Sequence, residues 1–227
     1  MRSLFMVMAL LLVDDKIADR LWESSKVVDE LVKAPDSDIP KELLKKAECI
    51  AVIPGLKKAA LGFGGELGKG AVSCKKDGGK GPFGAPALIS ITGGSFGFQL
   101  GAQETDVVML FMTPDSFKYL MRDKVTLGVD ASAAGGPKGR EASAETNASM
   151  RSEILTYSRA RGLFAGISLE GSTLRPDDDA SADVYGHPIK AKDIVRSQKM
   201  GVPVTGRHLV NVLQKSTPRN ESERASN

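Results

Sequence analysis

The stretch Leu61-Gly-Phe-Gly-Gly-Glu-Leu-Gly-Lys-Gly-Ala-Val-Ser-Cys74 alternates glycines at even positions with large apolar residues at odd positions. Side chains alternate between the two faces of a strand, so a two-residue period predicts a β-strand. A strand face made of glycine costs chain entropy, and it is tolerated where a sheet coils tightly or another backbone lies against it. The stretch therefore predicts a strongly curled sheet.

Further strands are predicted on both sides of this stretch. Alternation returns in residues 95–102, 127–133 and 163–171, and continuous apolar runs occupy residues 49–53, 87–91 and 107–112. Residues 153–159 favour a strand, although residues 148–155 also fit a helix. Helices are predicted over residues 15–33, 40–47, 113–121 and 177–184, and short basic helices or turns over 189–198 and 207–213. The fold class is α+β, a strongly curled, largely antiparallel glycine-rich β-sheet or barrel with flanking helices.

Length and charge limit the organisation and the partners. The length of 227 residues predicts one domain, placed over 14–213. The apolar start predicts a possible signal or apolar leader over 1–13, and the polar end predicts a disordered tail over 214–227. Lys and Arg number 31 and Asp and Glu 28, so the net charge is only +3. A nucleic-acid-binding protein would be more basic, and nucleic acid is excluded as a partner.

The N-terminus bears on location. Arg2 and the apolar run of residues 4–13 have the charge and length of an export signal, which we favour over an uncleaved anchor, a trimmed signal or the start of the next helix. We expect an extracytoplasmic, membrane-associated protein, periplasmic or secreted. Cys49 and Cys74 are the only cysteines, and such a compartment would allow them to form a disulfide.

No catalytic residue, cofactor or metal is predicted. Gly93-Gly-Ser-Phe-Gly97 matches the Gly-x-Ser-x-Gly motif of serine hydrolases, but Ser95 runs into an alternating strand instead of the helix that this motif requires. An esterase using Ser95 is therefore the least favoured alternative. The acids of residues 177–179 are interpreted as a helix cap in preference to a Ca²⁺ site.

Basic residues cluster at the ends of predicted strands despite the small net charge. Gathered on one rim, they would attract anionic lipid headgroups, whereas isolated lysine pairs are usually solvated surface. The candidate headgroup-binding residues are Lys57, Lys58, Lys69, Lys138 and Arg140.

A long ordered series of motifs resembles the SYLF family. The series covers Asp15 to about Tyr185 and includes Ala47-Glu-Cys-Ile-Ala-Val-Ile-Pro54, Phe63-Gly-Gly-Glu-Leu-Gly-Lys-Gly70, Thr92-Gly-Gly-Ser-Phe-Gly-Phe-Gln99 and Gly162-Leu-Phe-Ala-Gly166. The resemblance implies non-enzymatic binding of anionic phospholipids at a membrane, phosphoinositides in eukaryotic members, with actin or another protein as a further partner.

The resemblance also implies roles for particular residues. By position, Lys57, Lys58 and Lys69 are the expected headgroup contacts. The N-terminal helix is expected to insert Leu21 and Trp22 into the membrane, although the same apolar stripe could pack on the sheet. The alternative function is that of a structural or protein-partner-binding envelope protein.

Overall fold

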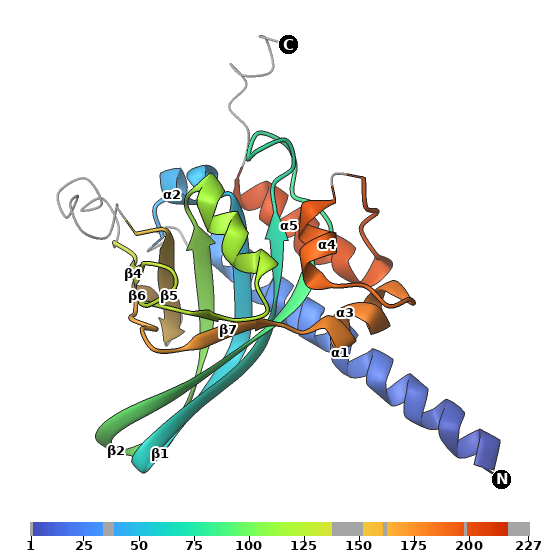
Figure 1. Cartoon of the computed structure of the whole chain (residues 1–227), viewed down its shortest axis with the longest axis horizontal. Helices are drawn as coiled ribbons and strands as arrows, with labels where there is room; N and C mark the ends of the chain where they lie inside the picture. Colours follow the sequence, from blue (N-terminus) through green and yellow to red (C-terminus); the bar gives the residue numbers. More distant parts are fainter. Residues whose placement is uncertain (1, 34–38, 138–151, 161–162, 198, 218–227) are drawn as a thin grey trace.

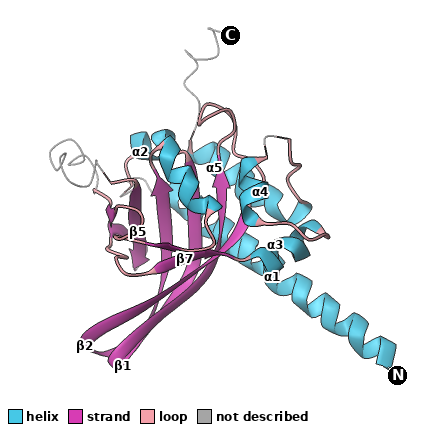
Figure 2. Ribbon diagram, viewed as in Figure 1, coloured by secondary structure: helices cyan, strands magenta, loops and turns pink. Residues whose placement is uncertain are grey.

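The computed structural model describes residues 2–33, 39–137, 152–160, 163–197 and 199–217 (Figure 1). Helices and strands alternate irregularly along the chain (Figure 2). The helices are α1 (Arg2–Lys33), α2 (Lys41–Lys46), α3 (Asp178–Tyr185), α4 (Ala191–Arg196) and α5 (Arg207–Ser216), with 3₁₀ helices η1 (Pro114–Met121) and η4 (Val204–Gly206). The strands are β1 (Cys49–Cys74), β2 (Ala87–Phe111), β3 (Val125–Thr126), β4 (Ala133–Gly135), β5 (Ile154–Ala160), β6 (Leu163–Gly166) and β7 (Thr173–Pro176).

Strands β1 and β2 form one long antiparallel ribbon that the rest of the sheet extends. Pairing runs from Cys49 opposite Phe111 to Val72 opposite Ala87. Strand β5 pairs with the C-terminal half of β2, and β7 pairs with its N-terminal half. In Figure 1 the ribbon projects from the body and folds back on itself. The predicted α+β class with a strongly curled sheet is confirmed, and apolar segments predicted as separate strands are continuous in β1 and β2.

The two ends of β1 lie side by side because the ribbon folds back. The amide of Lys75 donates a hydrogen bond of 2.8 Å to the carbonyl of Glu48, and Cys49 and Cys74 form a disulfide. A Cβ at Gly70 would overlap the Val52 carbonyl, so only glycine permits this approach of one half of β1 to the other. Within the period-two pattern, Gly70 thus makes a backbone-to-backbone contact, whereas Gly68 faces the side chains of Ile53 and Leu56.

Both faces of the sheet are covered, which explains the continuous apolar runs. Ile50 and Val52 belong to the core under α1, α2 and α5, whereas Ala51 and Ile53 belong to the core that includes η1 and α4. Adjacent residues on a strand face opposite sides, so a strand buried on both sides is apolar at every position. The sheet is therefore the middle layer of the domain (Figure 1).

Two predicted strands are much shorter in the structure. In the predicted strand 127–133, residues 128–130 form a turn between β3 and β4 and only Ala133 is in a strand. Gly128 has a φ of +83°, and the Thr126 amide donates to the Asp130 carboxylate at 2.7 Å. Predicted strand 163–171 ends at Gly166. In both segments the alternating pattern was misleading because turn contacts outweigh it.

The chain ends differ in part from the predicted boundaries. The apolar run of residues 4–13 and the amphipathic segment after it form the single helix α1. Helix α5 includes residues 214–216, so these belong to the domain and the predicted disordered tail is wrong there. Residues 218–227 lie outside the described part of the chain.

Reduction of the disulfide is expected to lower the free energy of unfolding by about 3 kcal/mol, because the bond closes a loop between residues 25 positions apart. Urea unfolding with and without a thiol reductant measures this change. The variant with Cys49→Ser and Cys74→Ser is the control, since it leaves the reductant no target. An unchanged urea midpoint on reduction of the natural chain would contradict the expectation.

Candidate functional site

A groove of about 950 Å³ lies between α1 and the part of the β1–β2 ribbon that is nearest to the body of the domain. Its charged lining contains as many basic as acidic residues, so the groove has no excess of either sign. Leu67 also lines it and is 55% exposed. The basic residues are Lys16, Arg20, Lys57, Lys69 and Arg159, and the acidic residues are Asp19, Glu23, Glu30, Glu104 and Asp106.

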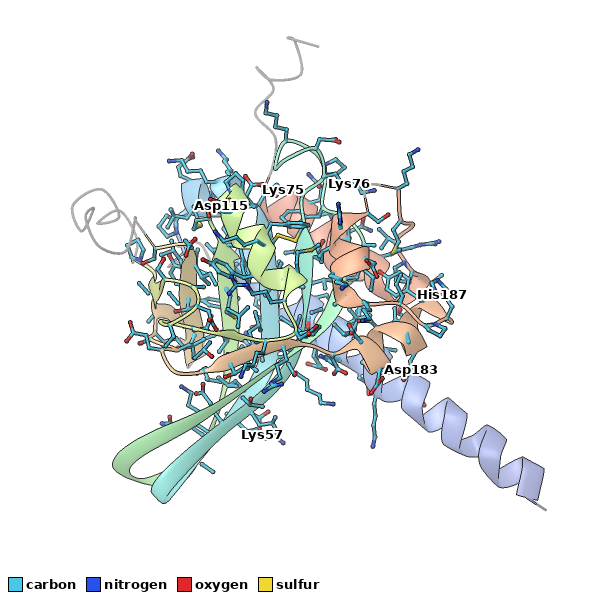
Figure 3. The ribbon with its side chains drawn as sticks, in the orientation of Figure 1. Lys57, Lys75, Lys76, Asp115, Asp183 and His187 are labelled. Atoms are coloured by element: carbon cyan, nitrogen blue, oxygen red, sulfur yellow. A yellow bond between two sulfur atoms is a disulfide. The ribbon has the colours of Figure 1, made fainter. Side chains whose placement is uncertain are left out.

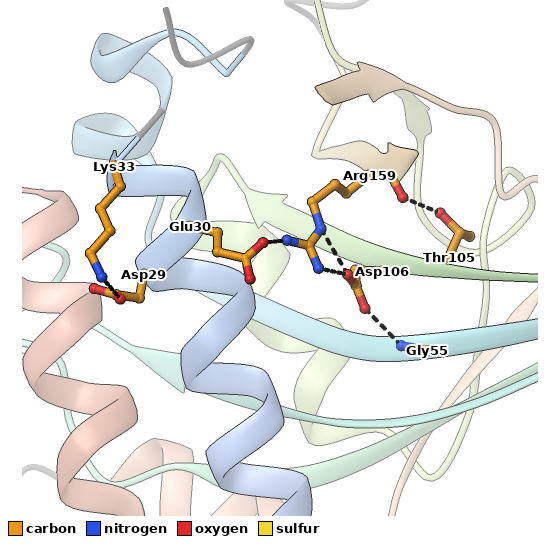
Figure 4. A network of polar contacts seen from close by, with 7 residues as sticks. All are labelled: Asp29, Glu30, Lys33, Gly55, Thr105, Asp106 and Arg159. Atoms are coloured by element: carbon orange, nitrogen blue, oxygen red, sulfur yellow. Dashed lines mark hydrogen bonds and ion pairs between the residues drawn. The ribbon is translucent and has the colours of Figure 1, made fainter. Parts of the chain in front are cut away.

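Arg159 of β5 is held by acids from two other elements (Figure 4). Its Nε donates to Asp106 Oδ2 of β2 at 2.8 Å, and its Nη1 pairs with Glu30 of α1. The second oxygen of Asp106 accepts the Gly55 amide at 2.9 Å. Burial lowers the pKa of the Arg159 guanidinium, which nevertheless stays charged because an arginine pKa is so high. Its charge is therefore balanced within the protein.

Arg20 connects α1 to the sheet from the other side of the groove. Its side chain is 8% exposed, and it donates to the backbone carbonyls of Gly70, at 2.9 Å, and of Ile89. Its Nη1 lies 2.7 Å from Asp177 Oδ2. Asp177 also caps α3 by accepting the Ala180 amide. The predicted helix cap is thus present, and the carboxylate has a second role in pairing with Arg20.

The ionised state of Asp177 is favoured by its neighbours. Burial by itself would raise the pKa of this carboxyl, but the hydrogen bond and the positive charge of Arg20, with Lys69 nearby, outweigh burial and hold the pKa below its usual value. The pair is therefore ionised at neutral pH. Arg20 and Arg159 both line the groove, and they form ion pairs with acidic residues of the protein itself.

The structure brings two of the five predicted headgroup residues together. Lys57 and Lys69 are exposed and line the groove, and Lys57 lies on the ribbon (Figure 3). Lys58 does not line it and pairs with Glu66 at 2.9 Å, because neighbouring strand residues face opposite sides. Lys138 and Arg140 lie outside the described residues.

Of the two predicted membrane-inserting residues, one is exposed. Trp22 is 50% exposed and stacks on His208 of α5, with 4.8 Å between ring centroids. Leu21 is fully buried in the core, so its predicted insertion into a membrane is wrong for this structure. The amphipathic stripe of α1 packs on the sheet.

The described residues offer no arrangement for other predicted alternatives. Ser95 lies within β2, opposite Gly64, so the strand-turn-helix geometry of a hydrolase nucleophile is missing there. Among residues with described positions, no group of three or more metal-binding side chains occurs, and no helix is long and apolar enough to span a bilayer.

Sequence reasoning missed the residues that support the groove. Arg20 and Asp177 are separated by 157 positions, and Asp106 and Arg159 by 53. No local pattern links such distant charges, and the two-residue period involves only apolar residues and glycines. Only the lysines nearest to the glycine-rich stretch could be found from the sequence.

The fold and the groove define an α+β domain with one curled sheet and a groove lined by charges of both signs. The sequence model of a family described as "Ysc84: Las17-binding protein actin regulator" matches residues 92–216, more than half of the chain. The chain belongs to this family, and the resemblance to SYLF proteins is confirmed.

Relatives come from fungi and vertebrates. LAS seventeen-binding protein 3 of Saccharomyces cerevisiae is 34% identical over 76% of this chain and 39% of its own length. Protein YSC84 of the same yeast is 32% identical over 85% of this chain and 42% of its own length. SH3 domain-containing YSC84-like protein 1 of Rattus norvegicus is 33% identical over 92% and 60%. The chain thus spans about two to three fifths of the length of these relatives. The names of the first and the third denote a binding protein and an SH3 domain-containing protein.

The predicted extracytoplasmic location is wrong. The relatives are yeast and vertebrate proteins named for Las17 and for SH3 domains. The apolar run that suggested an export signal is continuous with the amphipathic part of α1. A periplasmic or secreted assignment therefore has no support from the family.

The variant Asp177→Asn is expected to have a free energy of unfolding about 3 kcal/mol lower than that of the natural chain at neutral pH. The reason is that the substitution leaves the Arg20 charge buried without its partner. The carboxylate has a lowered pKa when folded, so its contribution is complete above about pH 5 and is lost as the pH falls through that lowered pKa.

Urea unfolding from pH 7 to pH 2 measures the difference between the variant and the natural chain, which should shrink at acid pH. Asp183→Asn, at an exposed position of the same helix, is the matched control and should change stability by less than about 0.5 kcal/mol. A difference that stays constant down to pH 2 would refute the proposed ion-pair contribution.

Proposed function

We propose that this chain is a non-enzymatic binding module that docks a segment of an actin-regulating protein partner in the groove. Lys57 and Glu104 carry the proposal. They face each other across β1 and β2, both are exposed, and neither forms an ion pair with a described residue. Together with exposed Leu67 they offer a partner one cation, one anion and an apolar contact.

The balance of charge in the groove favours a protein segment. Arg20 and Arg159 are already neutralised by Asp177, Asp106 and Glu30, so they add little attraction for a free anion. A peptide with residues of both signs can satisfy Lys57 and Glu104 at the same time, whereas a purely anionic ligand would meet repulsion from Glu104. The family description, which refers to Las17 binding and actin regulation, and the name of the yeast relative LAS seventeen-binding protein 3 agree with this partner class.

An enzymatic role has no support among the described residues. His208 is stacked on Trp22, and His187 lies in an exposed turn with Nδ1 3.3 Å from the Pro188 carbonyl oxygen. Neither histidine lines the groove. A histidine base would have to reach a substrate held there.

Binding to an anionic membrane surface is the second candidate function. Lys57 and Lys69 are exposed on the same groove as Leu67, and an apolar residue beside lysines is the arrangement of an interfacial contact. Each lysine near an anionic surface contributes about 1 kcal/mol. In this candidate function Lys57 and Lys69 keep the headgroup-binding role expected from the sequence, and Leu21, which is buried, does not insert into the membrane.

Lys57→Glu is expected to weaken binding of the chain to a Las17-type protein or to filamentous actin about fivefold, since loss of one interface charge costs about 1 kcal/mol. Pull-down and co-sedimentation with each purified partner measure the effect. Lys124→Glu makes the same charge change at an exposed position outside the groove and should bind as the natural chain does. Equal losses in both variants, or no binding of the natural chain to either partner, would exclude the groove as the docking site.

The membrane candidate predicts co-sedimentation with phosphatidylserine-containing vesicles that falls as NaCl is raised, because screening weakens exposed charge interactions. The double variant Lys57→Glu, Lys69→Glu should bind these vesicles at least tenfold less. Its control carries Lys124→Glu with Lys199→Glu. Binding to neutral phosphatidylcholine vesicles as strong as to anionic ones would eliminate this candidate.

A further inference from the structure

Two segments far apart in sequence bring six lysines to one end of the molecule, away from the groove. We call this surface the lysine end. Its two segments, residues 41–48 and 75–80, also contain three acids, so their net charge is +3. The whole chain has the same net charge of +3, and all remaining residues therefore sum to zero. The lysines are Lys41, Lys45, Lys46, Lys75, Lys76 and Lys80, and the acids are Glu42, Glu48 and Asp77.

The contact between the two segments is fixed by specific bonds. The Lys75 Nζ donates to the Lys45 carbonyl, in the last turn of α2, at 2.5 Å. The Lys75 amide bonds to Glu48, and the disulfide joins the residues next to these two. Burial, opposed by the charge of Glu48, lowers the pKa of the Lys75 ammonium. Lys75 is thus a positioning residue that holds α2 against the turn.

The acids of the lysine end are used internally, which leaves several lysines for a ligand. Glu42 pairs with Lys45 at 3.2 Å, and Glu48 lies near Lys75. Lys41 and Lys46 are exposed and Lys76 is half-buried, and none of the three forms an ion pair with a described residue. Figure 3 draws Lys75 and Lys76 at the end of the body opposite to Lys57, so a ligand here would leave the groove open.

We propose that the lysine end binds an acidic segment of a partner protein, at a site separate from the groove. The large apolar side chains that are exposed in the described part of the chain are Trp22, Leu67, Val129 and Val204, and none belongs to this surface. Three lysines without an apolar anchor would hold an anionic bilayer only weakly. Discrete carboxylates on a peptide can instead pair with individual ammonium groups through charge-assisted hydrogen bonds.

The test uses the full chain and a fluorescein-labelled peptide of alternating glutamate and serine, followed by fluorescence anisotropy at about 50 mM NaCl. We expect Lys46→Glu with Lys76→Glu to weaken binding at least tenfold. Lys124→Glu with Lys199→Glu changes the net charge equally at exposed positions elsewhere and should stay within twofold of the natural chain. Lys57→Glu should also leave peptide binding unchanged, which separates this site from the groove.

Lys46→Gln with Lys76→Gln, a milder change, provides a second test if the reversed charges disturb folding, and should still lose about threefold. No binding of the peptide by the natural chain, or equal loss in the two double-glutamate variants, would overturn the proposal. A loss confined to the Lys46 and Lys76 variants in sedimentation with phosphatidylserine vesicles, without any effect on the peptide, would assign the lysine end to a membrane and overturn it as well.

Discussion

The return of β1 onto itself is the constraint on which the other features depend. The two halves of this 26-residue strand come closer at Gly70 than a side chain would allow, because the bare backbone of Gly70 lies against Val52. Strand β2 pairs with β1 along this folded path, and β5 and β7 pair with opposite halves of β2. Hydrophobic burial on both faces then stabilises the curled layer.

Two arginines, Arg20 and Arg159, link helix α1 to the rest of the domain. Arg20 of α1 donates to two strand carbonyls and pairs with Asp177, the N-cap of α3. Arg159 of β5 pairs with Glu30 of α1 and with Asp106 of β2. Buried charges of this kind are costly unless they are paired, and here every pairing connects different elements. Within the groove the roles are therefore divided: Arg20 and Arg159 are paired inside the protein, whereas Lys57 and Lys69 are exposed.

The sequence predicted the architecture better than the site. Alternation in residues 61–74 correctly indicated a curled sheet because it reflects a local rule, the opposite facing of neighbouring strand residues. The same rule failed in residues 127–133, where Gly128 and Asp130 form a turn. Lys57 and Lys69 were predicted as headgroup contacts from the basic clusters and the family resemblance, and both line the groove. Arg20 and Asp177 could not be found, since only the folded chain brings them together.

The stacking of Trp22 on His208 gives the domain an internal optical reporter. Trp22 is the only tryptophan of the chain, and it joins α1, near the beginning, to α5, near the end of the described residues. The emission of Trp22 is therefore sensitive to its contact with the imidazole of His208, which lies far from Trp22 in the sequence. Any event that lifts α1 from the sheet changes the surroundings of this one indole ring, so the docking of the helix can be followed by intrinsic fluorescence without a label.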